Sequence, residues 1–428
     1  MSTLTHQAIE SIWRMESAKI IAGLTRIVRD VGLAEELAQD ALVSALEQWP
    51  KAGVPDNPAA WLTAAAKHRA IDLWRRNKLL ERKHEELQRE LAKQELAMPD
   101  LESAMDDHVG DDLLRLIFIS CHPVLSSEAR VALTLRLLGG LTTAEIARAF
   151  LIQEPAVAQR IVRAKRTLAE AHIPFELPRK SELTPRLASV LEVIYLVFNE
   201  GYSATAGDDW TRPALCEEAL RLGRILAELA PEESEVHGLV ALMEIQASRV
   251  AARAGPSGEP ILLLKQNRAL WDHLLIRRGL AALDRASALA ATPGPYALQA
   301  AIAACHARAL DAESTDWPRI ASLYEQLGKL TPSPVIELNR AVAVGMAFGP
   351  AAGLELIETL SSDPSLESYH LLPSVRADLL FKLGRFAEAQ ADFERAASLT
   401  RNARERELLL GRARASAQST PSNPPSAN

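Results

Sequence analysis

The chain has 428 residues, more than a single hydrophobic core usually supports, so we expect several domains. Its formal net charge of −7 excludes a protein that binds nucleic acid through overall positive charge, and any DNA contact must come from local basic patches. Three widely spaced cysteines without a CxxC pair argue against a disulfide framework or a structural zinc site.

Composition also predicts the fold class and the compartment. Aromatic residues make up only 5% of the chain, and apolar residues recur at helical rather than alternating spacing, which predicts an all-α protein. The first residues lack a basic segment followed by an apolar run, and no stretch of about 18 apolar residues occurs. We therefore expect a cytoplasmic protein without membrane contact, metal or cofactor.

The first two predicted helices span residues 6–29 and 33–49, and Gly32 is expected to break the chain between them. The second helix carries acidic and amide side chains in its first turns, a surface suited to a basic partner helix. Acidic residues are also favoured at any helix N-terminus by the helix dipole, which is the alternative interpretation. The side chains concerned are Glu35, Glu36, Gln39 and Asp40.

A third helix is predicted over residues 59–83. Seven basic and two acidic residues lie between Ala60 and Lys83, interleaved with Trp61 and Trp74. Basic side chains hold phosphates and indole rings stack on unpaired bases, so the pattern favours nucleic-acid binding. A solvated charged face with two core tryptophans is the alternative. The basic residues are Lys67, Arg69, Arg75, Arg76, Lys78, Arg82 and Lys83.

Residues 84–110 are polar and acidic, which predicts a flexible linker. Two helices are expected within residues 111–138. Ser126 or Ser127 can cap the second of them, and the pair Gly139-Gly140 ends it.

The segment 141–168 has the layout of a helix-turn-helix. Thr142 or Thr143 can cap a first helix that ends at Phe150, and Pro155 suits the first turn of the second helix. An ordinary pair of amphipathic helices with a solvated basic face is the alternative. The apolar face of the second helix carries Val157, Ile161, Ala164 and Leu168. The polar face, which has no acidic residue, carries Gln159, Arg160, Arg163, Lys165 and Arg166.

The chain resembles a bacterial sigma factor in the order and spacing of three motifs, which are AEELAQDALVSALEQW, NPAAWLTAAAKHRAIDLWRR and, after the acidic linker, the helix-turn-helix. It is similar in particular to the extracytoplasmic-function group of the sigma-70 family, which keeps only regions 2 and 4. The resemblance implies a protein that is not an enzyme. It implies that the chain binds bacterial core RNA polymerase and promoter DNA and directs transcription initiation.

The resemblance also implies roles for individual residues. The implied contacts with the β′ clamp helices of core polymerase, from region 2.2, are Glu36, Gln39 and Asp40. The implied contacts that melt and read the −10 element are Trp61, Lys67, Arg69, Trp74, Arg75 and Arg76. The implied contacts with the −35 element are Thr143, Gln159, Arg160, Arg163, Lys165 and Arg166. Many members of the group have threonine and lysine where Ala156 and Ala158 stand here, so base preference at −35 does not carry over.

The sigma-like part ends near Pro178, and a helical block is predicted over residues 179–290. Polar residues gather at its centre, in residues 198–213. They predict a small pocket or a docking loop. The alternative is an ordered loop with internal hydrogen bonds. An enzyme centred on Glu200, Tyr202 and Asp208 has little support, because no nucleophile–base pair or phosphate-binding glycine loop accompanies them. Residues 266–289 are predicted to form one helix that contains Trp271.

Tetratricopeptide-like repeats are predicted over residues 291–415. Residues 377–397 have the small, large and glycine positions of such a repeat, with its turn at residues 383–386. Residues 341–360 align to it at an offset of 36, which places Gly353 on Ala389 and Ile357 on Phe393. Residues 317–332 are a candidate second helix of an earlier unit. Such units stack, and their concave surface typically binds a peptide or protein partner.

The full layout resembles a sigma-factor subgroup with a long helical and tetratricopeptide-like extension, a similarity also carried by the segments FNEGY, GPYALQAAIAACHA and SPVIELNRAVAV. We expect the extension to regulate the sigma part. The alternative is a tetratricopeptide-type adaptor or transcriptional regulator that uses the helix-turn-helix only for DNA binding. The predicted segments are 1–83 (region 2), 84–110 (linker), 111–178 (region 4), 179–290 (helical block), 291–415 (repeats) and 416–428 (disordered tail).

Overall fold

The computed structural model describes residues 2–85, 109–150, 152–203, 211–256 and 259–419. The predicted linker lies mostly outside these residues, as do Asp208 and most of the predicted tail. Every regular element in the described part is helical, with one isolated antiparallel bridge between Ala254 and Pro260, so the all-α prediction is confirmed. The chain divides into two compact units, residues 1–194 and 195–428.

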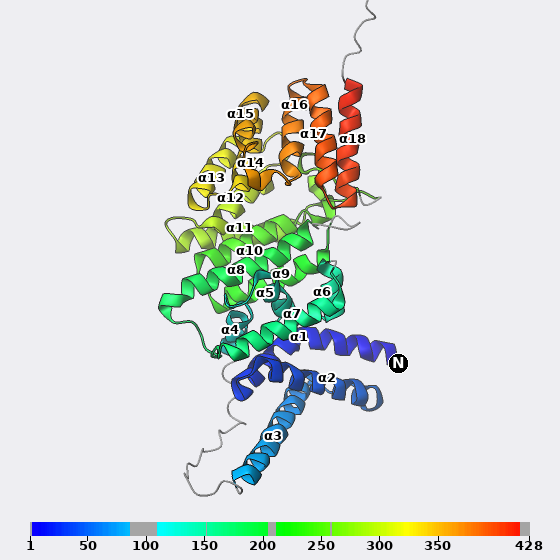
Figure 1. The fold of residues 1–428 in the computed structure, drawn as a ribbon, viewed down its shortest axis with the longest axis vertical. Coiled ribbons are helices and arrows are strands. Elements are labelled where there is room, and N and C mark those ends of the chain that lie inside the picture. Colours follow the sequence, from blue (N-terminus) through cyan, green and yellow to red (C-terminus); the bar gives the residue numbers. More distant parts are fainter. Residues whose placement is uncertain (1, 86–108, 151, 204–210, 257–258, 420–428) are drawn as a thin grey trace, which may run out of the picture. The chain divides into compact units, whose positions relative to one another are not determined.

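The first unit contains seven helices and most of an eighth among its described residues (Figure 1). None of the helices in the described part of the chain is long and apolar enough to cross a membrane. The helices are α1 (Ser2–Val28), α2 (Val31–Ala52), α3 (Pro58–Glu85), α4 (Val109–Ser120), α5 (Ser127–Leu137), α6 (Thr143–Phe150), α7 (Glu154–Glu170) and α8 (Lys180–Tyr202).

The break between α1 and α2 does not lie at Gly32, so that prediction was wrong. Arg29 takes the left-handed conformation with φ +55°, and the side chain of Asp30 accepts a hydrogen bond from the Leu33 backbone N–H at 2.8 Å. This aspartate cap begins α2 at Val31. Gly32 is therefore inside the first turn of α2, since a glycine near a helix start is tolerated when a stronger cap precedes it.

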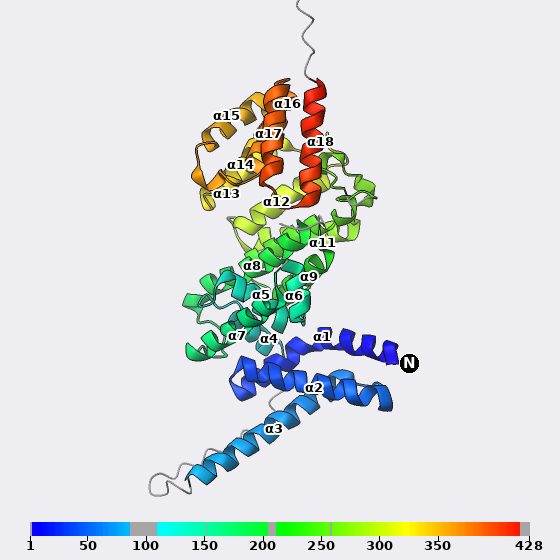
Figure 2. The same cartoon turned by 45° about the vertical axis from the view of Figure 1, so that its right-hand side comes forward.

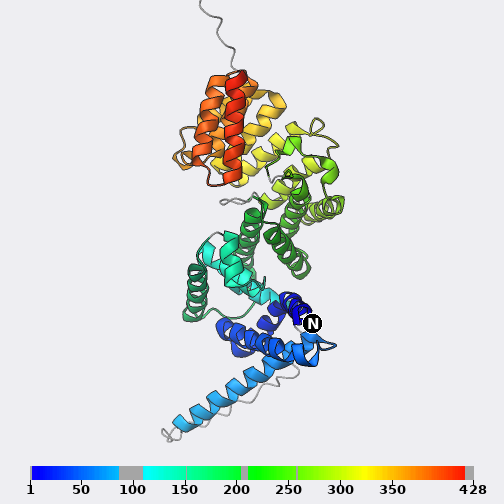
Figure 3. The ribbon, with the colours of Figure 1, turned by 90° about the vertical axis from the view of Figure 1, so that its right-hand side faces the viewer.

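The helices α1 to α3 pack around an apolar centre formed mainly by α1 and α2. Trp49 is almost fully buried, and its ring meets that of Trp61 edge to face, with centroids 5.3 Å apart. This pair joins the C-terminal end of α2 to the start of α3. Beyond it, α3 continues as a straight helix away from α1 and α2, drawn in light blue in Figure 3.

The helices α4 to α7 follow their predicted boundaries closely. The side chain of Ser126 caps α5 through the Ala129 N–H. Thr142 caps α6, because its hydroxyl accepts from the Glu145 N–H at 3.1 Å while the Glu145 carboxylate accepts from the Thr142 N–H at 2.8 Å. This reciprocal capping box settles the choice between Thr142 and its neighbour. A proline in the first turn of α7 agrees with the predicted start of that helix.

The N-terminal half of α8 is attached to α4 and α5. The guanidinium of Arg186 donates to the Phe118 carbonyl at 2.8 Å, and the hydroxyl of Ser189 donates to the Cys121 carbonyl at 2.6 Å. From α5, Arg130 donates to Ser189 and to Glu192, the latter at 3.1 Å. A carbonyl in the last turn of α4 and the carbonyl that directly follows the helix thus accept hydrogen bonds from α8.

The second unit holds the end of α8 and a series of helices that run to the C-terminus. Trp271 was predicted inside a helix over residues 266–289, and this is wrong. Two short 3-10 turns precede Trp271, and the helix begins only at His273, where Asp272 caps it by accepting from two backbone N–H groups. The elements are α9 (Pro213–Leu229), α10 (Ser234–Ala247), η1 (Val250–Ala252), η2 (Leu263–Lys265), η3 (Arg268–Leu270), α11 (His273–Leu289), α12 (Pro295–Arg308), α13 (Trp317–Leu330), α14 (Pro334–Phe348), α15 (Pro350–Leu360), η4 (Pro364–Leu366), α16 (Leu371–Lys382), α17 (Phe386–Leu399) and α18 (Ala403–Ser419).

The last helices form successive antiparallel hairpins around one apolar cluster (Figures 1 and 2). Ile357 on α15 and Phe393 on α17, which the predicted repeat places on each other, are both almost completely buried in it. The helix α18 runs four residues into the segment that was predicted to be a disordered tail. Residues 416–419 are helical, and the buried Ser416 hydroxyl donates to the Arg412 carbonyl at 3.0 Å. The tail prediction was therefore wrong for those four residues.

Gly384 makes the turn between α16 and α17, and its φ of +75° leads to a prediction. A β-carbon there has no atom within 4 Å, so the cost of Gly384→Ala comes from backbone strain alone. We expect about 1–2 kcal/mol loss in the free energy of unfolding, measured by urea titration. The control is Gly411→Ala inside α18, which we expect to stabilise the protein by up to about 1 kcal/mol. Equal stability of the Gly384→Ala variant and the wild type would contradict the prediction.

Candidate nucleic-acid interface

The helix α7 has the two faces that the sequence predicts. Its apolar side chains are buried against α5 and α6, and its polar side chains are exposed. The buried set is Val157, Ile161, Ala164 and Leu168. The exposed set is Gln159, Arg160, Arg163 and Arg166. An exposed, positively charged helix of this kind has the side chains needed to enter a DNA major groove.

The two central arginines of this face are available for a ligand. Within the part of the chain that the structure describes, Arg160 and Arg163 make no ion pair and no hydrogen bond through their side chains. Val162, between them in sequence, is 63% exposed. Among the described residues Arg166 pairs with Glu170 at 3.0 Å, and both side chains are largely exposed. Such surface pairs are weak, so this one does not hold Arg166 firmly.

Two of the residues predicted to contact the −35 element are already engaged within the protein. The hydroxyl of Thr143 donates to the Glu154 carboxylate at 3.1 Å, which joins the starts of α6 and α7. The ammonium group of Lys165 pairs with the Glu35 carboxylate on α2, and its side chain is only 20% exposed. Lys165 therefore differs from its basic neighbours on α7, whose charges face solvent.

The predicted polymerase-binding residues lie along α2. Glu36 and Asp40 are exposed, one turn apart, whereas Gln39 is half-buried and donates to Glu35. Asp40 pairs with Arg69 on α3 at 2.9 Å, and Arg69 also donates to the Ser44 hydroxyl at 2.6 Å. Of the four side chains predicted to form an acidic and amide surface, Glu36 and Asp40 are exposed, whereas Glu35 is buried and so does not belong to that surface.

The predicted −10 residues all lie on α3. Trp61 is half-buried because it packs on Trp49, and Lys67 is half-buried one and a half turns further along. The backbone of α3 continues as a helix through Trp74, Arg75 and Arg76, but the side chains of these three lie outside the described part of the structure. The contact of Trp61 with Trp49 therefore agrees with the predicted alternative, in which this tryptophan packs in the core and does not stack on a base.

Three ionic contacts link α1 and α2 with the helices α4 to α7, and sequence reasoning missed them. Arg26 pairs with the buried Asp112 at 2.9 Å, and Arg14 pairs with Glu145 at 2.5 Å. In the third contact, Glu35 accepts a hydrogen bond from Arg136 at 2.6 Å and forms an ion pair with Lys165. One feature of the sequence could have indicated the contact of Glu35. This residue follows Ala34 at the edge of the apolar stripe of α2, and a carboxylate buried there needs a partner.

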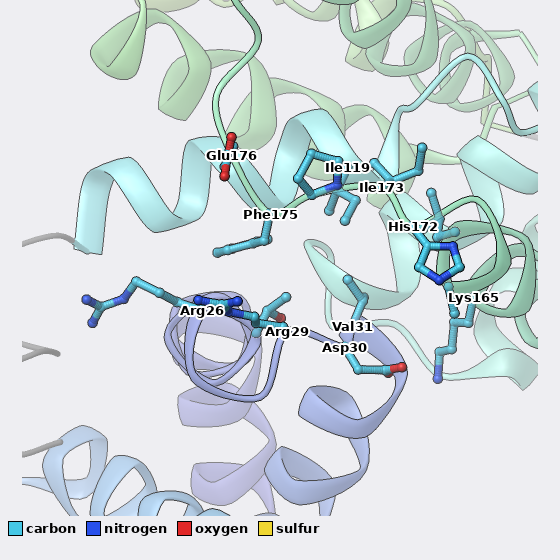
Figure 4. Close-up of a pocket in the computed structure, with 14 residues that line it drawn as sticks. Arg26, Arg29, Asp30, Val31, Ile119, Lys165, His172, Ile173, Phe175 and Glu176 are labelled. Atoms are coloured by element: carbon cyan, nitrogen blue, oxygen red, sulfur yellow. The ribbon is translucent and has the colours of Figure 1, made fainter. Parts of the chain in front are cut away.

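A cavity of about 600 Å³ lies beside these contacts (Figure 4). Arg26 and Arg29, from the end of α1, lie at one end of it, and Lys165 and His172 lie at the other. Phe175, from the segment after α7, lines the wall between them. The carboxylates of Asp30 and Glu176 also line the cavity, so its lining carries both signs of charge.

Cys121 and His122 are adjacent in the sequence, and thiolate and imidazole are both zinc ligands. Burial raises the pKa of the Cys121 thiol to about 11, and burial followed by the nearby Arg186 charge lowers the pKa of His122 to about 4. This adjacent pair is therefore a neutral thiol and a neutral imidazole at pH 7. No cluster of three metal-ligating side chains occurs among the described residues.

Side chains of the polar centre of the second unit have contacts within that unit. Glu200 forms an ion pair with Arg212, and the ring of Tyr202 lies under the Arg253 guanidinium at 3.7 Å. Glu200, Tyr202 and Arg212 thus have partners within the second unit, as the predicted alternative of internal contacts requires of them, and residues 204–210 of this segment lie outside the described residues. Asp208 lies outside the described residues.

Comparison with known proteins places family matches on these helices. Residues 13–79 match the family described as Sigma-70 region 2, residues 115–168 match Sigma-70, region 4, and residues 186–287 match a family of unknown function (DUF6596). The chain is 45% identical over 387 residues to an uncharacterized protein of Rhizobium meliloti (strain 1021), and the match covers 90% of each chain. No solved structure matches the chain.

Proposed function

This chain belongs to the sigma-70 family of RNA polymerase sigma factors, and from that premise we propose that it directs core RNA polymerase to a specific set of promoters as an extracytoplasmic-function member with a regulatory C-terminal extension. The main support for this proposal is that the region 2 match is followed by the region 4 match, with only residues 80–114 between them. That interval is too short for a further helical domain of ordinary size. Its site of action is the bacterial cytoplasm, where core polymerase transcribes.

The exposed face of α7 supports a role in reading the −35 element. Arg160 and Arg163 are one turn apart and unpaired within the described residues, so each can donate two hydrogen bonds to a guanine edge. Gln159 is exposed beside them and suits an adenine edge. Arg166 contributes phosphate contacts, as does Lys165 once it is released from Glu35.

The helices α2 and α3 supply the other two contacts of the proposed function. The exposed carboxylates of Glu36 and Asp40 on α2 form the docking surface for a basic partner helix of the polymerase. On α3, Lys67 and Arg69 hold the phosphates near the −10 element, and the basic segment from Trp74 to Arg76 continues that surface along the sequence.

We propose that the extension regulates the sigma part through α8. Arg186 donates to a carbonyl in the last turn of α4, Ser189 donates to the carbonyl of Cys121 directly after that helix, and Arg130 on α5 bonds back to α8. These contacts give the extension a direct attachment to the region 4 helices. The tetratricopeptide-like helices α13 to α18 then bind a peptide or protein partner, whose presence is transmitted along α8.

The test of the proposed function is in vitro transcription with purified core polymerase and a pool of genomic promoter fragments, followed by sequencing of the RNA starts. We expect starts that share two spaced sequence motifs and that require this chain. Starts identical to those of core polymerase alone would contradict the proposal. If the chain binds promoter fragments but never supports initiation, the adaptor hypothesis is favoured.

Removal of the extension provides a separate prediction. Deleting Ser181–Asn428 is expected to change the yield of initiation or the choice of promoters, because α4 and α5 lose their bonds to α8. The companion variant, Arg186→Ala with Ser189→Ala in the full chain, is expected to change transcription in the same direction. Circular dichroism and polymerase binding control for folding. Unchanged yield and promoter choice in both variants would contradict a regulatory role for the extension.

A further inference from the structure

The carboxylate of Glu35 is the meeting point of two parts of the first unit. Its side chain is only 4% exposed. Because glutamate is almost never buried without partners, we expect several groups to bind its carboxylate. It accepts hydrogen bonds from Gln39 on its own helix and from Arg136 on α5, the latter at 2.6 Å, and it forms an ion pair with Lys165 on α7. Two cationic groups from the region 4 helices thus converge on one carboxylate of α2.

The aliphatic stem of Lys165 lies against the first turn of α2. A β-carbon built on Gly32, in that turn, would lie 3.5 Å from Cδ of Lys165, which is an ordinary van der Waals distance. From this position the ammonium group of Lys165 reaches the Glu35 carboxylate. Arg136 adds to the contact by donating to the Leu141 carbonyl at 3.1 Å, directly before α6.

Two further ion pairs act in parallel with Glu35. Arg14 on α1 pairs with Glu145, the residue that caps α6, and Arg26 on α1 pairs with Asp112 on α4. The contact between the region 2 helices and the region 4 helices is therefore made by oppositely charged groups on both sides. Contacts of this kind can be displaced by another polyanion, and DNA is one.

We propose that Glu35 is an intramolecular competitor of DNA, which withholds Lys165 of the recognition helix in the free protein and releases it when the chain engages a promoter. The inference rests on the proposed function, since it assigns Lys165 to a phosphate contact. Its consequence is that the free chain binds DNA with one fewer phosphate contact than its exposed basic residues would allow. Glu35 thereby suppresses binding to DNA in the absence of polymerase.

The salt dependence of DNA binding tests this inference on the full chain. The logarithm of affinity falls with the logarithm of salt concentration by about 0.9 per phosphate contact. In the wild-type background, Lys165→Gln is expected to leave this slope nearly unchanged. In the Glu35→Gln background, the same substitution is expected to reduce the slope by about 0.9. The probe is a duplex DNA of mixed sequence, and the measurement is fluorescence anisotropy at several salt concentrations.

A matched control separates this effect from a simple change of net charge. Glu47 is exposed on the same helix and has no ion pair among the described residues, so Glu47→Gln removes the same charge. In the Glu47→Gln background, Lys165→Gln is expected to behave as it does in the wild type. An equal effect of Lys165→Gln in all three backgrounds would overturn the proposal, because Glu35 would then not be withholding the lysine.

A second readout needs neither DNA nor polymerase. Acetylation of individual lysines, followed by mass spectrometry, is expected to modify Lys165 in the wild type more slowly than Lys329, whose side chain is 72% exposed. In Glu35→Gln the two rates are expected to converge. Rapid modification of Lys165 in the wild type would overturn the competitor role even if the chain initiates transcription. If Lys165 is modified slowly but the chain never initiates transcription, the contact between Glu35 and Lys165 is supported. The proposed function is then contradicted.

Discussion

Replacing Arg160 and Arg163 together by alanine is expected to abolish promoter-specific initiation while polymerase binding is retained. Both guanidinium groups are exposed on α7 and have no ion pair in the described part of the chain. A good bidentate contact with a base edge discriminates by about 1–3 kcal/mol, so loss of both corresponds to a reduction of roughly 30-fold to more than 10⁴-fold in promoter selection. In vitro transcription measures the first outcome, and co-purification with core polymerase measures the second.

The control for this double variant is Arg277→Ala with Arg319→Ala. Both are exposed arginines of the extension, so the change in net charge is the same. We expect this control to keep promoter-specific initiation. If the Arg160 and Arg163 variant loses polymerase binding instead, α7 has a docking role and the assigned roles are wrong. If it initiates as the wild type does, α7 does not read the promoter.

The substitution Asp112→Ala is expected to destabilise the first unit strongly. The Asp112 side chain is 3% exposed and pairs with Arg26 at 2.9 Å and with Arg115 at 2.6 Å. Removing one partner of a buried ion pair leaves the other charge desolvated, which costs about 3–5 kcal/mol. Chemical denaturation followed by circular dichroism measures this loss in the free energy of unfolding.

The comparison variant for Asp112 is Glu170→Ala. Glu170 pairs with Arg166 at similar distance, but its side chain is 65% exposed. Solvent screens this pair, and an exposed pair four residues apart on a helix contributes about 0.3–0.5 kcal/mol. A loss of similar size in the two variants would mean that Asp112 is not buried between its arginines in solution.

Local patterns in the sequence predicted the helix-turn-helix well. The predicted first helix, ending at Phe150, and the predicted start of the second near Pro155 agree with α6 and α7. These boundaries depend on short-range effects, namely the capping box at Thr142 and the proline in the first turn of α7. The two faces of α7 were equally predictable, because a period of 3.6 residues places Val157 and Ile161 on one side and Arg160 and Arg163 on the other.

Predictions failed where two local signals competed. Gly32 was expected to end a helix, but the carboxylate of Asp30 accepts from the Leu33 N–H and starts α2 earlier. Trp271 was expected in a helix, but the cap made by Asp272 begins α11 only after it. In both cases an aspartate cap outweighed the simpler composition signal, and from the sequence alone the strengths of the two could not be ranked.

The sequence by itself determined that this chain is helical, where α7 begins, and which face of α7 carries the positive charge. Only the tertiary structure decided that Lys165 is bound to Glu35 while Arg160 and Arg163 remain exposed. The physical reason is that periodicity assigns a side chain to a face of its own helix, whereas the partner of that face depends on how distant helices pack. Glu35 and Lys165 are 130 positions apart along the chain, and nothing in the local pattern of either residue specifies the other.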